Sequence, residues 1–284
     1  MTNDQQKLKQ ITVEALTKVF HDHIRLGKEG VKEYRKNQFG EICLEGDWRA
    51  EEEVIRTLKD HKVPIKIISE EHGVINLGEE FLGVLDGLDG TSNYIRFVNG
   101  DATARYGTMF GIYRSSDPFY RDYLVSTIIE HPTRKLFLAS KKKGVHVFDM
   151  QTGEKFALRS PERKISKQRA LIDIDKRYAH YEFLHGYVRK LPRNFQFRNL
   201  DSDAAHYTAL ITGNADLLFE CTRKRNLEIA VGYGLVTEWN GVMVTLDEED
   251  IGTKKYLEFG QQEYVPVISA ANVGLARDFI RQIR

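Results

Sequence analysis

Two aspartates, Asp86 and Asp89, lie three residues apart in the segment Asp86-Gly-Leu-Asp-Gly-Thr91. Carboxylates this close repel each other unless a cation lies between them. Mg²⁺ suits such a pair, because it binds one or two carboxylates together with carbonyls, waters and substrate phosphate. The glycines allow a tight turn, and Thr91 and Ser92 are candidate N-caps of a helix whose start could bind phosphate. The alternative is a polar turn, since Asp, Asn, Ser and Gly also favour turns for local reasons.

Two glutamates precede this segment and strengthen the metal interpretation. The β-rich run Val63–Ile68 is followed by Ser69-Glu70-Glu71, and the run Phe81–Leu85 is followed by Asp86. If these two strands are neighbours, Glu70 and Asp86 reach the same edge of a sheet. Several carboxylates at one edge indicate a site for one or two metal ions.

The first half of the chain reads as helices followed by a strand meander. Apolar residues between positions 5 and 26 have helical spacing, and Gly27 follows as a stop signal. The polar stretch 31–47 predicts a loop or short hairpin, and a second helix is expected from Ala50. Four further strands at even spacing predict a mostly antiparallel sheet. They are Thr103–Tyr113, Tyr123–Glu130, Lys135–Ser140 and Gly144–Phe148.

The polar segment Gln151–Gln168 predicts a boundary between two parts, residues 1–160 and 161–284. Strands and helices alternate beyond it, which favours an α/β arrangement for the second part. The expected strands are Ala170–Ile174, Ala215–Phe219, Gly241–Leu246 and Val265–Ala270. The expected helices are one near Tyr178–Lys190 and those at Ala204–Ile211, Leu227–Glu238 and Gly274–Ile283.

Composition argues against several classes of protein. Lys and Arg (42) nearly balance Asp and Glu (41), whereas binders of nucleic-acid polymers usually have a basic excess. The chain shows no apolar run long enough to span a membrane, and the polar N-terminus predicts no signal peptide. The two cysteines, Cys43 and Cys221, are too few for a disulfide framework. We expect reduced thiols in a cytoplasmic protein, with a regulatory disulfide as the alternative.

The order of the motifs resembles the inositol monophosphatase family of lithium-sensitive phosphatases. Glu70-Glu71 is followed by Asp86-x-x-Asp-Gly-Thr-x-Asn-aromatic, and Asp47 stands near the second helix as in that family. Later matches extend the resemblance over nearly the whole chain. They are His131-Pro132, Leu136–Ala139, Asp201–Ala205, Gly213–Glu220, Leu227–Gly232, Leu235–Gly241 and Ser269–Asn272.

The resemblance implies a layered α-β-α-β-α sandwich of the sugar phosphatase type, of α+β or α/β class, with two packed halves. It implies a phosphoric monoester hydrolase that acts on a small polyol, sugar or nucleotide phosphate, such as inositol 1-phosphate or fructose 1,6-bisphosphate. The implied cofactor is Mg²⁺, as two or three ions, with Mn²⁺ as a substitute. A homodimer, lithium sensitivity and the absence of membrane or nucleic-acid partners are further expectations.

The resemblance also assigns metal ligands. Glu70, Asp86 and the backbone carbonyl of Leu88 would bind the first ion. The second ion would be bound by Asp86, Asp89 and Glu228. Such a pair would clamp the attacking and leaving oxygens of an in-line displacement at phosphorus.

Catalytic and substrate-binding roles follow from the same resemblance. Glu70 and Thr91, with Asp47 behind them, would orient and deprotonate the attacking water. For Asp47 the alternative is a helix N-cap, and for Glu220 it is a solvated strand end. The expected substrate-binding residues are Gly90 and Thr91, through their N–H groups, and Asp201, Ser202, Asp203 and Glu220.

Several positions depart from the family pattern. Gly87 replaces a proline, which we expect to loosen the loop, and Leu227 replaces a tryptophan. Glu228 replaces an aspartate and is one methylene longer, whereas Mg²⁺ requires near-ideal octahedral geometry. Asp201 and Asp203 stand at positions that are usually small. Two carboxylates there would repel an anionic substrate unless they face sugar hydroxyls or a cation.

Two rival interpretations remain. The run Ala170-Leu-Ile-Asp173-Ile-Asp175 is similar to the start of a haloacid-dehalogenase-type phosphatase site, although Arg177 replaces the expected Thr or Val. The substitution Asp173→Asn would abolish turnover only in such an enzyme. The departures above also suggest a phosphosugar- or metal-binding relative that has lost turnover.

Overall fold

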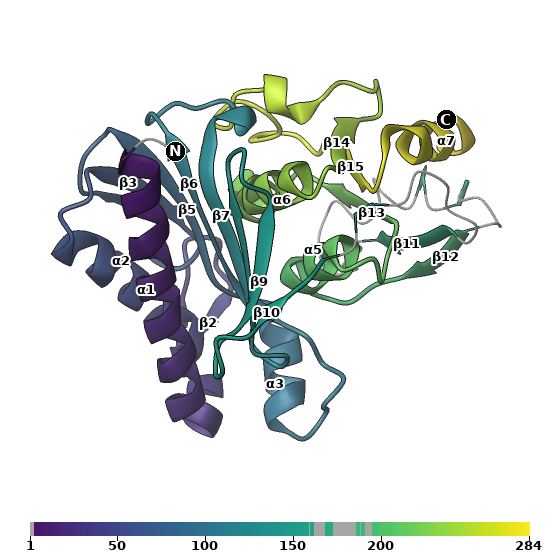
Figure 1. The fold of residues 1–284 in the computed structure, drawn as a ribbon. Helices are drawn as coiled ribbons and strands as arrows, with labels where there is room; N and C mark the ends of the chain where they lie inside the picture. The colour runs from purple at the N-terminus through teal and green to yellow at the C-terminus, as the bar shows by residue number, and fades with distance from the viewer. Residues whose placement is uncertain (1–2, 159, 162–167, 173–185, 188, 191–194) are drawn as a thin grey trace.

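The computed structural model describes residues 3–158, 160–161, 168–172, 186–187, 189–190 and 195–284. Within these residues, helices and sheets alternate in layers, helix, sheet, helix, sheet and helix (Figure 1). This is the α-β-α-β-α sandwich expected from the sequence. The helix expected near Tyr178–Lys190 lies largely outside the described residues. Asp173 and Asp175 of the rival phosphatase interpretation lie outside them entirely.

The larger sheet has, among the described residues, eight strands in the order β10-β9-β8-β7-β6-β5-β3-β4. They are β3 (Ile65–Ser69), β4 (Val74–Asn76), β5 (Phe81–Asp89), β6 (Gly107–Arg114), β7 (Tyr123–Glu130), β8 (Lys135–Ser140), β9 (Val145–Asp149) and β10 (Lys155–Phe156). The sheet is mostly antiparallel, as predicted, but β3 and β5 run parallel with Ser69 opposite Leu85. Glu70, just after β3, and Asp86, in β5, therefore lie at the same edge, which confirms the expectation from the sequence.

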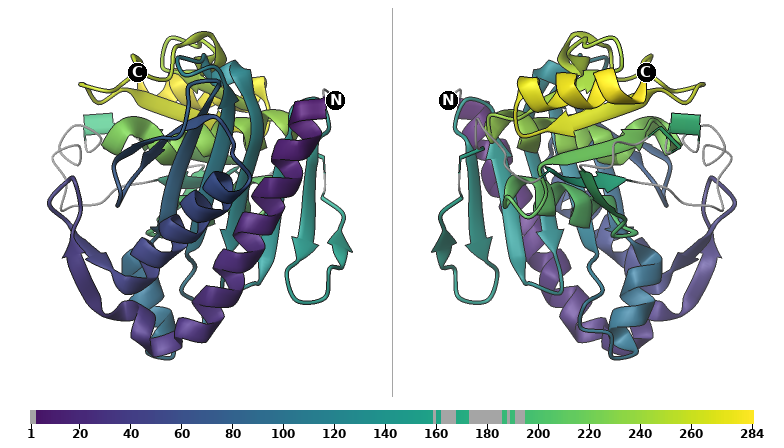
Figure 2. Two further views of the ribbon diagram at one scale, coloured as in Figure 1. Left: turned by 90° about the vertical axis from the view of Figure 1, so that its left-hand side faces the viewer. Right: turned by 90° about the vertical axis from the view of Figure 1, so that its right-hand side faces the viewer.

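Two long helices cover one face of this sheet (Figure 2). They are α1 (Asn3–Leu26) and α2 (Glu45–Asp60). The apolar residues of α1 recur at helical spacing, so Leu8, Ile11, Leu16 and Val19 form one buried stripe against the sheet. A hairpin of β1 (Glu33–Lys36) and β2 (Ile42–Leu44) leads into α2, after the short helix η1 (Gly27–Val31).

The opposite face of the larger sheet packs on α5 (Asp203–Ile211) and α6 (Leu227–Glu238). Every residue of α6 from Leu227 to Val236 is buried, because a second sheet lies on its other side. The described strands of that sheet have the order β12-β11-β13-β15-β14. They are β11 (Gln168–Ile172), β12 (Phe195–Arg198), β13 (Leu217–Cys221), β14 (Val242–Thr245) and β15 (Pro266–Ala270), and α7 (Val273–Ile283) covers the outer face.

The boundaries of two elements near the carboxylates differ from the sequence prediction. β5 does not end at Leu85, because Asp89 resumes pairing with Gly107 of β6 after a bulge that starts at Asp86. The segment predicted as a loop is therefore the bulged end of a buried strand. Helix α2 begins at Glu45 rather than near Ala50, so Asp47 lies in its first turn.

Candidate metal centre

Three buried carboxylates meet at the end of β5. Asp86 and Asp89 come from the bulged strand end, and Glu228 comes from the first turn of α6. Each offers an oxygen, and these oxygens all lie within 4.8 Å of one another. The chain thus brings together residues that are far apart in the sequence, and oxygen donors of this kind suit a hard cation such as Mg²⁺.

Electrostatics make this cluster costly without a cation. Burial, Glu70 and Asp89 raise the pKa of Asp86 well above its usual range. Burial, Asp203 and Glu228 do the same for the pKa of Asp89. A divalent cation between the carboxylates would remove this repulsion, so the donor set fits the metal that the sequence predicts.

Glu70 and Leu88 lie beside this cluster. The Glu70 N–H donates to the Leu85 carbonyl at 3.1 Å, which holds Glu70 at the sheet edge, and its side chain is half-buried. The Leu88 N–H donates to Asp86 Oδ1 at 2.9 Å. The Thr91 hydroxyl donates to the Leu88 carbonyl at 3.3 Å, so these two predicted site residues are neighbours.

The turn from Gly90 to Ser92 differs in one respect from the prediction. Neither Thr91 nor Ser92 is the N-cap of α3 (Thr91–Val98), because Gly90 takes that place with a φ of 86°. A glycine is required there for two reasons. The backbone is left-handed, and a Cβ would lie 2.7 Å from Ser202 Cβ. Thr91 is instead the first residue of the helix, where backbone N–H groups lack partners within the helix.

Gly87 does not loosen the loop, and that expectation was wrong. A Cβ at Gly87 would lie 2.5 Å from the Asp47 carbonyl oxygen and 2.8 Å from Glu51 Cγ. The φ of Gly87 is not positive, so its backbone conformation does not require glycine. Glycine is needed because α2 approaches the end of β5 closely at this position. Leu227, which replaces the tryptophan of the family pattern, is buried in the core between the sheets.

Glu51 is a structural residue of the site that the sequence analysis missed. Its fully buried carboxylate accepts bonds from the whole turn after β3. The donors are the Ser69 hydroxyl, the N–H groups of Glu70, Glu71 and His72, and His72 Nδ1. The spacing from Asp47 held a signal, because residues four apart lie on one face of a helix.

We expect Glu51→Gln to destabilise this turn and weaken metal binding. A glutamine keeps one acceptor oxygen but places an amide, which cannot accept, against the remaining donors. Leaving at least one buried donor unpaired costs about 1–3 kcal/mol of unfolding free energy. Chemical denaturation measures this loss. The exposed neighbour Glu52→Gln is the control, and equal stability of the two variants would contradict this role for Glu51.

Asp47 is in the first turn of α2 rather than at the N-cap. One carboxylate oxygen, Oδ2, accepts the Leu44 N–H at 2.9 Å, while Oδ1 is buried without a hydrogen-bond partner among the described residues. The carboxylate lies beside Cys43 and Glu71. Asp47 thus caps the helix in part, and one of its oxygens remains available to another group.

The segment Asp201–Ala205 joins the carboxylate cluster through Ser202. The Ser202 hydroxyl caps α5 by accepting the Ala205 N–H and donates to Asp89 Oδ2 at 2.5 Å. The Ala204 N–H donates to the same oxygen at 2.7 Å. Asp201 is exposed, with a φ of 54°.

Asp203 faces the guanidinium cation of Arg223. The sequence left open whether this carboxylate faces sugar hydroxyls or a cation. The Asp203 carboxylate is buried and is bound by Arg223 at 2.6 Å and by His206 at 3.0 Å. Burial alone would raise the pKa of Asp203, but Arg223 and His206 lower it to about 2. Arg223 also lies 3.8 Å from Glu228. Sequence analysis missed Arg223, although the basic run Arg223-Lys-Arg225 precedes Glu228.

Glu220 is buried in β13, so its interpretation as a solvated strand end was wrong. Its carboxylate accepts the Tyr207 hydroxyl at 2.7 Å and lies 3.5 Å from the Ser269 hydroxyl. These contacts hold its side chain between α5 and β15.

Comparison with known proteins agrees with this geometry. The model of the inositol monophosphatase family matches residues 1–277. The chain belongs to the inositol monophosphatase family. The expected phosphoric monoester hydrolase is thereby confirmed at the level of the family. Among curated protein sequences, none matches the chain.

Several solved structures share the fold. SuhB from Bartonella henselae is 14% identical with a TM-score of 0.73, covering 97% of each chain. Fructose-1,6-bisphosphatase from Leishmania major is 17% identical with a TM-score of 0.72, covering 98% of this chain and 95% of the other. An IMPase/NADP phosphatase solved with Mg²⁺ and phosphate is 14% identical with a TM-score of 0.72, covering 99% of this chain and 96% of the other.

Among the described residues, none of the helices is both long and apolar enough to cross a membrane.

Proposed function

We propose that this family member is a Mg²⁺-dependent phosphomonoesterase that hydrolyses a small polyol, sugar or nucleotide phosphate. The observation that carries the proposal is the convergence of Asp86, Asp89 and Glu228 within 4.8 Å, beside Glu70. Four acidic groups, one just after β3, two in β5 and one in α6, would be strongly destabilising if their purpose were only structural. The related phosphatase with bound Mg²⁺ and phosphate supports the same cofactor for this fold.

In this proposal two groups of ligands bind two ions. Glu70, Asp86 and the Leu88 carbonyl bind the first, and Asp86, Asp89 and Glu228 bind the second. A third ion, or Mn²⁺ in place of Mg²⁺, is compatible with the same oxygen donors. When bound, the ions would neutralise charge on the phosphate and acidify a nearby water.

The protein groups would position the reactants around these ions. Glu70 and Thr91 orient the attacking water and take its proton, and Asp47 supports them from α2. The contact between Thr91 and Leu88 supports this placement, because it sets the hydroxyl next to a metal ligand. The N–H groups of Gly90 and Thr91, at the start of α3, bind phosphate oxygens.

The substrate side would bind the alcohol part of the ester. Ser202 positions Asp89, and Asp201, Asp203 and Glu220 are the residues that we assign to the hydroxyl groups of the substrate. In the structure Asp203 is bound by Arg223, and Glu220 is bound by Tyr207. Because Arg223 neutralises Asp203, an anionic substrate meets less repulsion than the sequence alone suggests. Inositol 1-phosphate and fructose 1,6-bisphosphate are therefore both reasonable first substrates.

Three further features remain predictions of this proposal. We expect a homodimer in solution, lithium sensitivity and a cytoplasmic location. We also propose that residues 1–160 and 161–284 form two halves that both contribute to the site. The larger sheet ends at Phe156 and the second starts at Gln168, which supports a division in that region.

A phosphate-release panel tests the proposed function. Inositol phosphates, sugar mono- and bisphosphates and 3′-phosphoadenosine-type nucleotides are each incubated with the protein and Mg²⁺, with and without Li⁺. We expect release from at least one ester, which stops on chelation and is inhibited by Li⁺. Release that is unaffected by chelation of divalent ions would contradict the proposal.

Metal binding should also stabilise the fold. Because a cation relieves the repulsion among Asp86, Asp89 and Glu228, Mg²⁺ should raise the melting temperature of the chelated protein. Ligand at one hundred times its Kd contributes about 2.7 kcal/mol. Differential scanning calorimetry measures the shift. A melting temperature that does not depend on Mg²⁺ would contradict metal binding at this cluster.

A further inference from the structure

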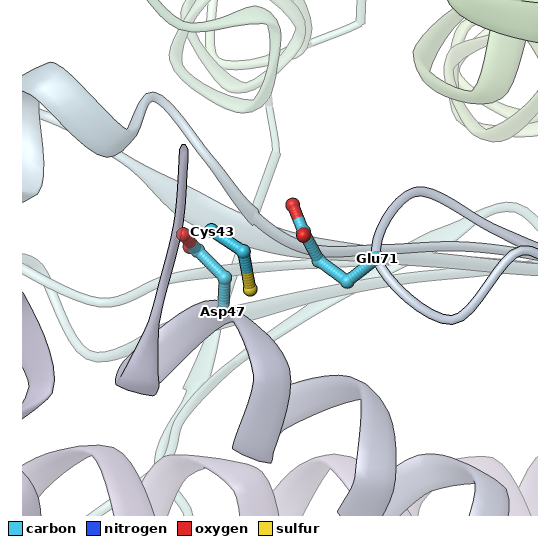
Figure 3. A group of neighbouring side chains, drawn as sticks. All are labelled: Cys43, Asp47 and Glu71. Carbon is cyan, nitrogen blue, oxygen red and sulfur yellow. The ribbon is translucent and has the colours of Figure 1, made fainter. Parts of the chain in front are cut away.

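A second group of metal-ligating side chains lies behind the proposed site. Cys43 comes from β2, Asp47 from the first turn of α2, and Glu71 from the turn after β3 (Figure 3). Their sulfur and carboxylate oxygens lie within 4.8 Å of one another. All three are buried, with exposed fractions of 0% for Cys43, 3% for Asp47 and 6% for Glu71.

Two carboxylate oxygens in this group have no hydrogen-bond partner among the described residues. Asp47 uses one oxygen to accept the Leu44 N–H, and Glu71 uses one to accept the Asn37 amide at 3.2 Å. Asp47 Oδ1 and Glu71 Oε2 are left over, although both are buried. A buried carboxylate oxygen without a donor costs free energy, so two of them beside a thiol indicate a ligand that accepts their charge.

The charge around the thiol leads to the same conclusion. Burial and the adjacent carboxylate of Glu71 raise the pKa of Cys43. A group that is this poorly solvated as an anion becomes a good ligand when a cation replaces the proton.

We propose that Cys43, Asp47 and Glu71 form a separate site for a borderline-soft divalent cation, with Zn²⁺ as the preferred ion. A thiolate with two carboxylates suits Zn²⁺ and Co²⁺, whereas Mg²⁺ requires oxygen ligands. Tetrahedral zinc with bonds of about 2.0–2.3 Å needs donors roughly 3.5 Å apart, so donor atoms that lie within 4.8 Å of one another need to close by at most about 1.3 Å. Binding releases the thiol proton to solvent, and a water completes the fourth position.

Occupation of this site should inhibit the phosphatase. Asp47 would be withdrawn from the attacking water because its free oxygen would bind the cation. This consequence rests on the proposed function, whereas binding itself does not. The two claims therefore need separate measurements.

Cobalt absorption tests binding independently of catalysis. The chelated full-length chain is titrated with Co²⁺, and thiolate-to-cobalt charge transfer is followed in the near ultraviolet. We expect one such band in the wild type, in Asp89→Asn and in Cys221→Ala, a control that removes the other buried cysteine. The band should be lost in Cys43→Ser and displaced in the wild type by Zn²⁺. Absence of the band in the wild type, or its survival in Cys43→Ser, would overturn the site.

Zinc inhibition tests the consequence. With Mg²⁺ saturating, we expect Cys43→Ser to retain wild-type phosphate release and to need at least about tenfold more Zn²⁺ for half-inhibition, the smallest loss typical of perturbed metal sites. Equal Zn²⁺ sensitivity of the two proteins would overturn the inhibitory role. Should the wild type release no phosphate, the proposed function fails, and the cobalt band still decides the site.

Discussion

Asp89→Asn should abolish Mg²⁺-dependent phosphate release without unfolding the protein. Asparagine can keep its oxygen towards Ser202 and the Ala204 N–H, the donors that Asp89 now accepts. Its amide nitrogen then faces Asp86 and Glu228, where it repels a cation instead of binding it. Loss of a direct ligand should lower kcat/KM by more than about 100-fold. Mutation of residues that only hydrogen-bond to metal ligands already lowers metal affinity or activity by about 10–100-fold.

Two measurements separate this effect from misfolding. In chelator, Asp89→Asn should melt no lower than the wild type, because one of several repelling carboxylates has been neutralised. It should also lose the stabilisation by Mg²⁺. Asp101→Asn, which neutralises a half-buried carboxylate that is paired with Arg96 outside the site, is the matched control and should keep full activity. Unchanged turnover in Asp89→Asn would refute the metal assignment.

Gly87→Ala should damage both stability and activity. The new methyl group would lie 2.5 Å from the Asp47 carbonyl oxygen, so α2 or the end of β5 must move. Overpacking of this kind costs about 1–3 kcal/mol of unfolding free energy. Because Asp47 and Asp86 lie on the two segments pushed apart, we also expect kcat to fall at least about tenfold, the cost of a small misplacement of positioned groups.

Gly111→Ala provides the comparison for this prediction. Gly111 lies in β6 of the same sheet, but a Cβ there would be 3.5 Å from Val231 Cγ2, an ordinary contact. Its stability and activity should remain close to those of the wild type. If Gly87→Ala behaved in the same way, the close packing of α2 on the strand end would not position the site.

The regular elements followed from the sequence wherever local pattern decides structure. Strands β7 and β8 and helix α6 have the predicted bounds, because apolar runs between turn residues leave little choice. The end of β5 did not follow, since its pairing with Gly107 depends on a bulge and on a partner strand far away in sequence. The start of α2 likewise depends on a local bond from the Leu44 N–H to Asp47.

The residues of the candidate site also differ in how far the sequence predicted them. Glu70, Asp86 and Asp89 could be grouped from the sequence because two parallel strands deliver them to one edge, and Glu228 was added through the family resemblance. The role of Glu51 was missed, since the spacing from Asp47 places Glu51 on the same face of α2 but does not show that its carboxylate binds the backbone N–H groups of the turn after β3. The pairing of Arg223 with Asp203 joins residues twenty positions apart, and it reverses the repulsion expected from Asp203 alone.

The central claim is that the carboxylates of Glu70 just after β3, of Asp86 and Asp89 in β5, and of Glu228 in α6 bind divalent cations at one place. Anomalous diffraction from crystals of the full chain soaked in Mn²⁺ locates such ions directly. We predict anomalous peaks enclosed by Glu70, Asp86, Asp89 and Glu228, which disappear in crystals of Asp89→Asn or decrease to one. Saturating Mn²⁺ without a peak among these four residues would contradict the account.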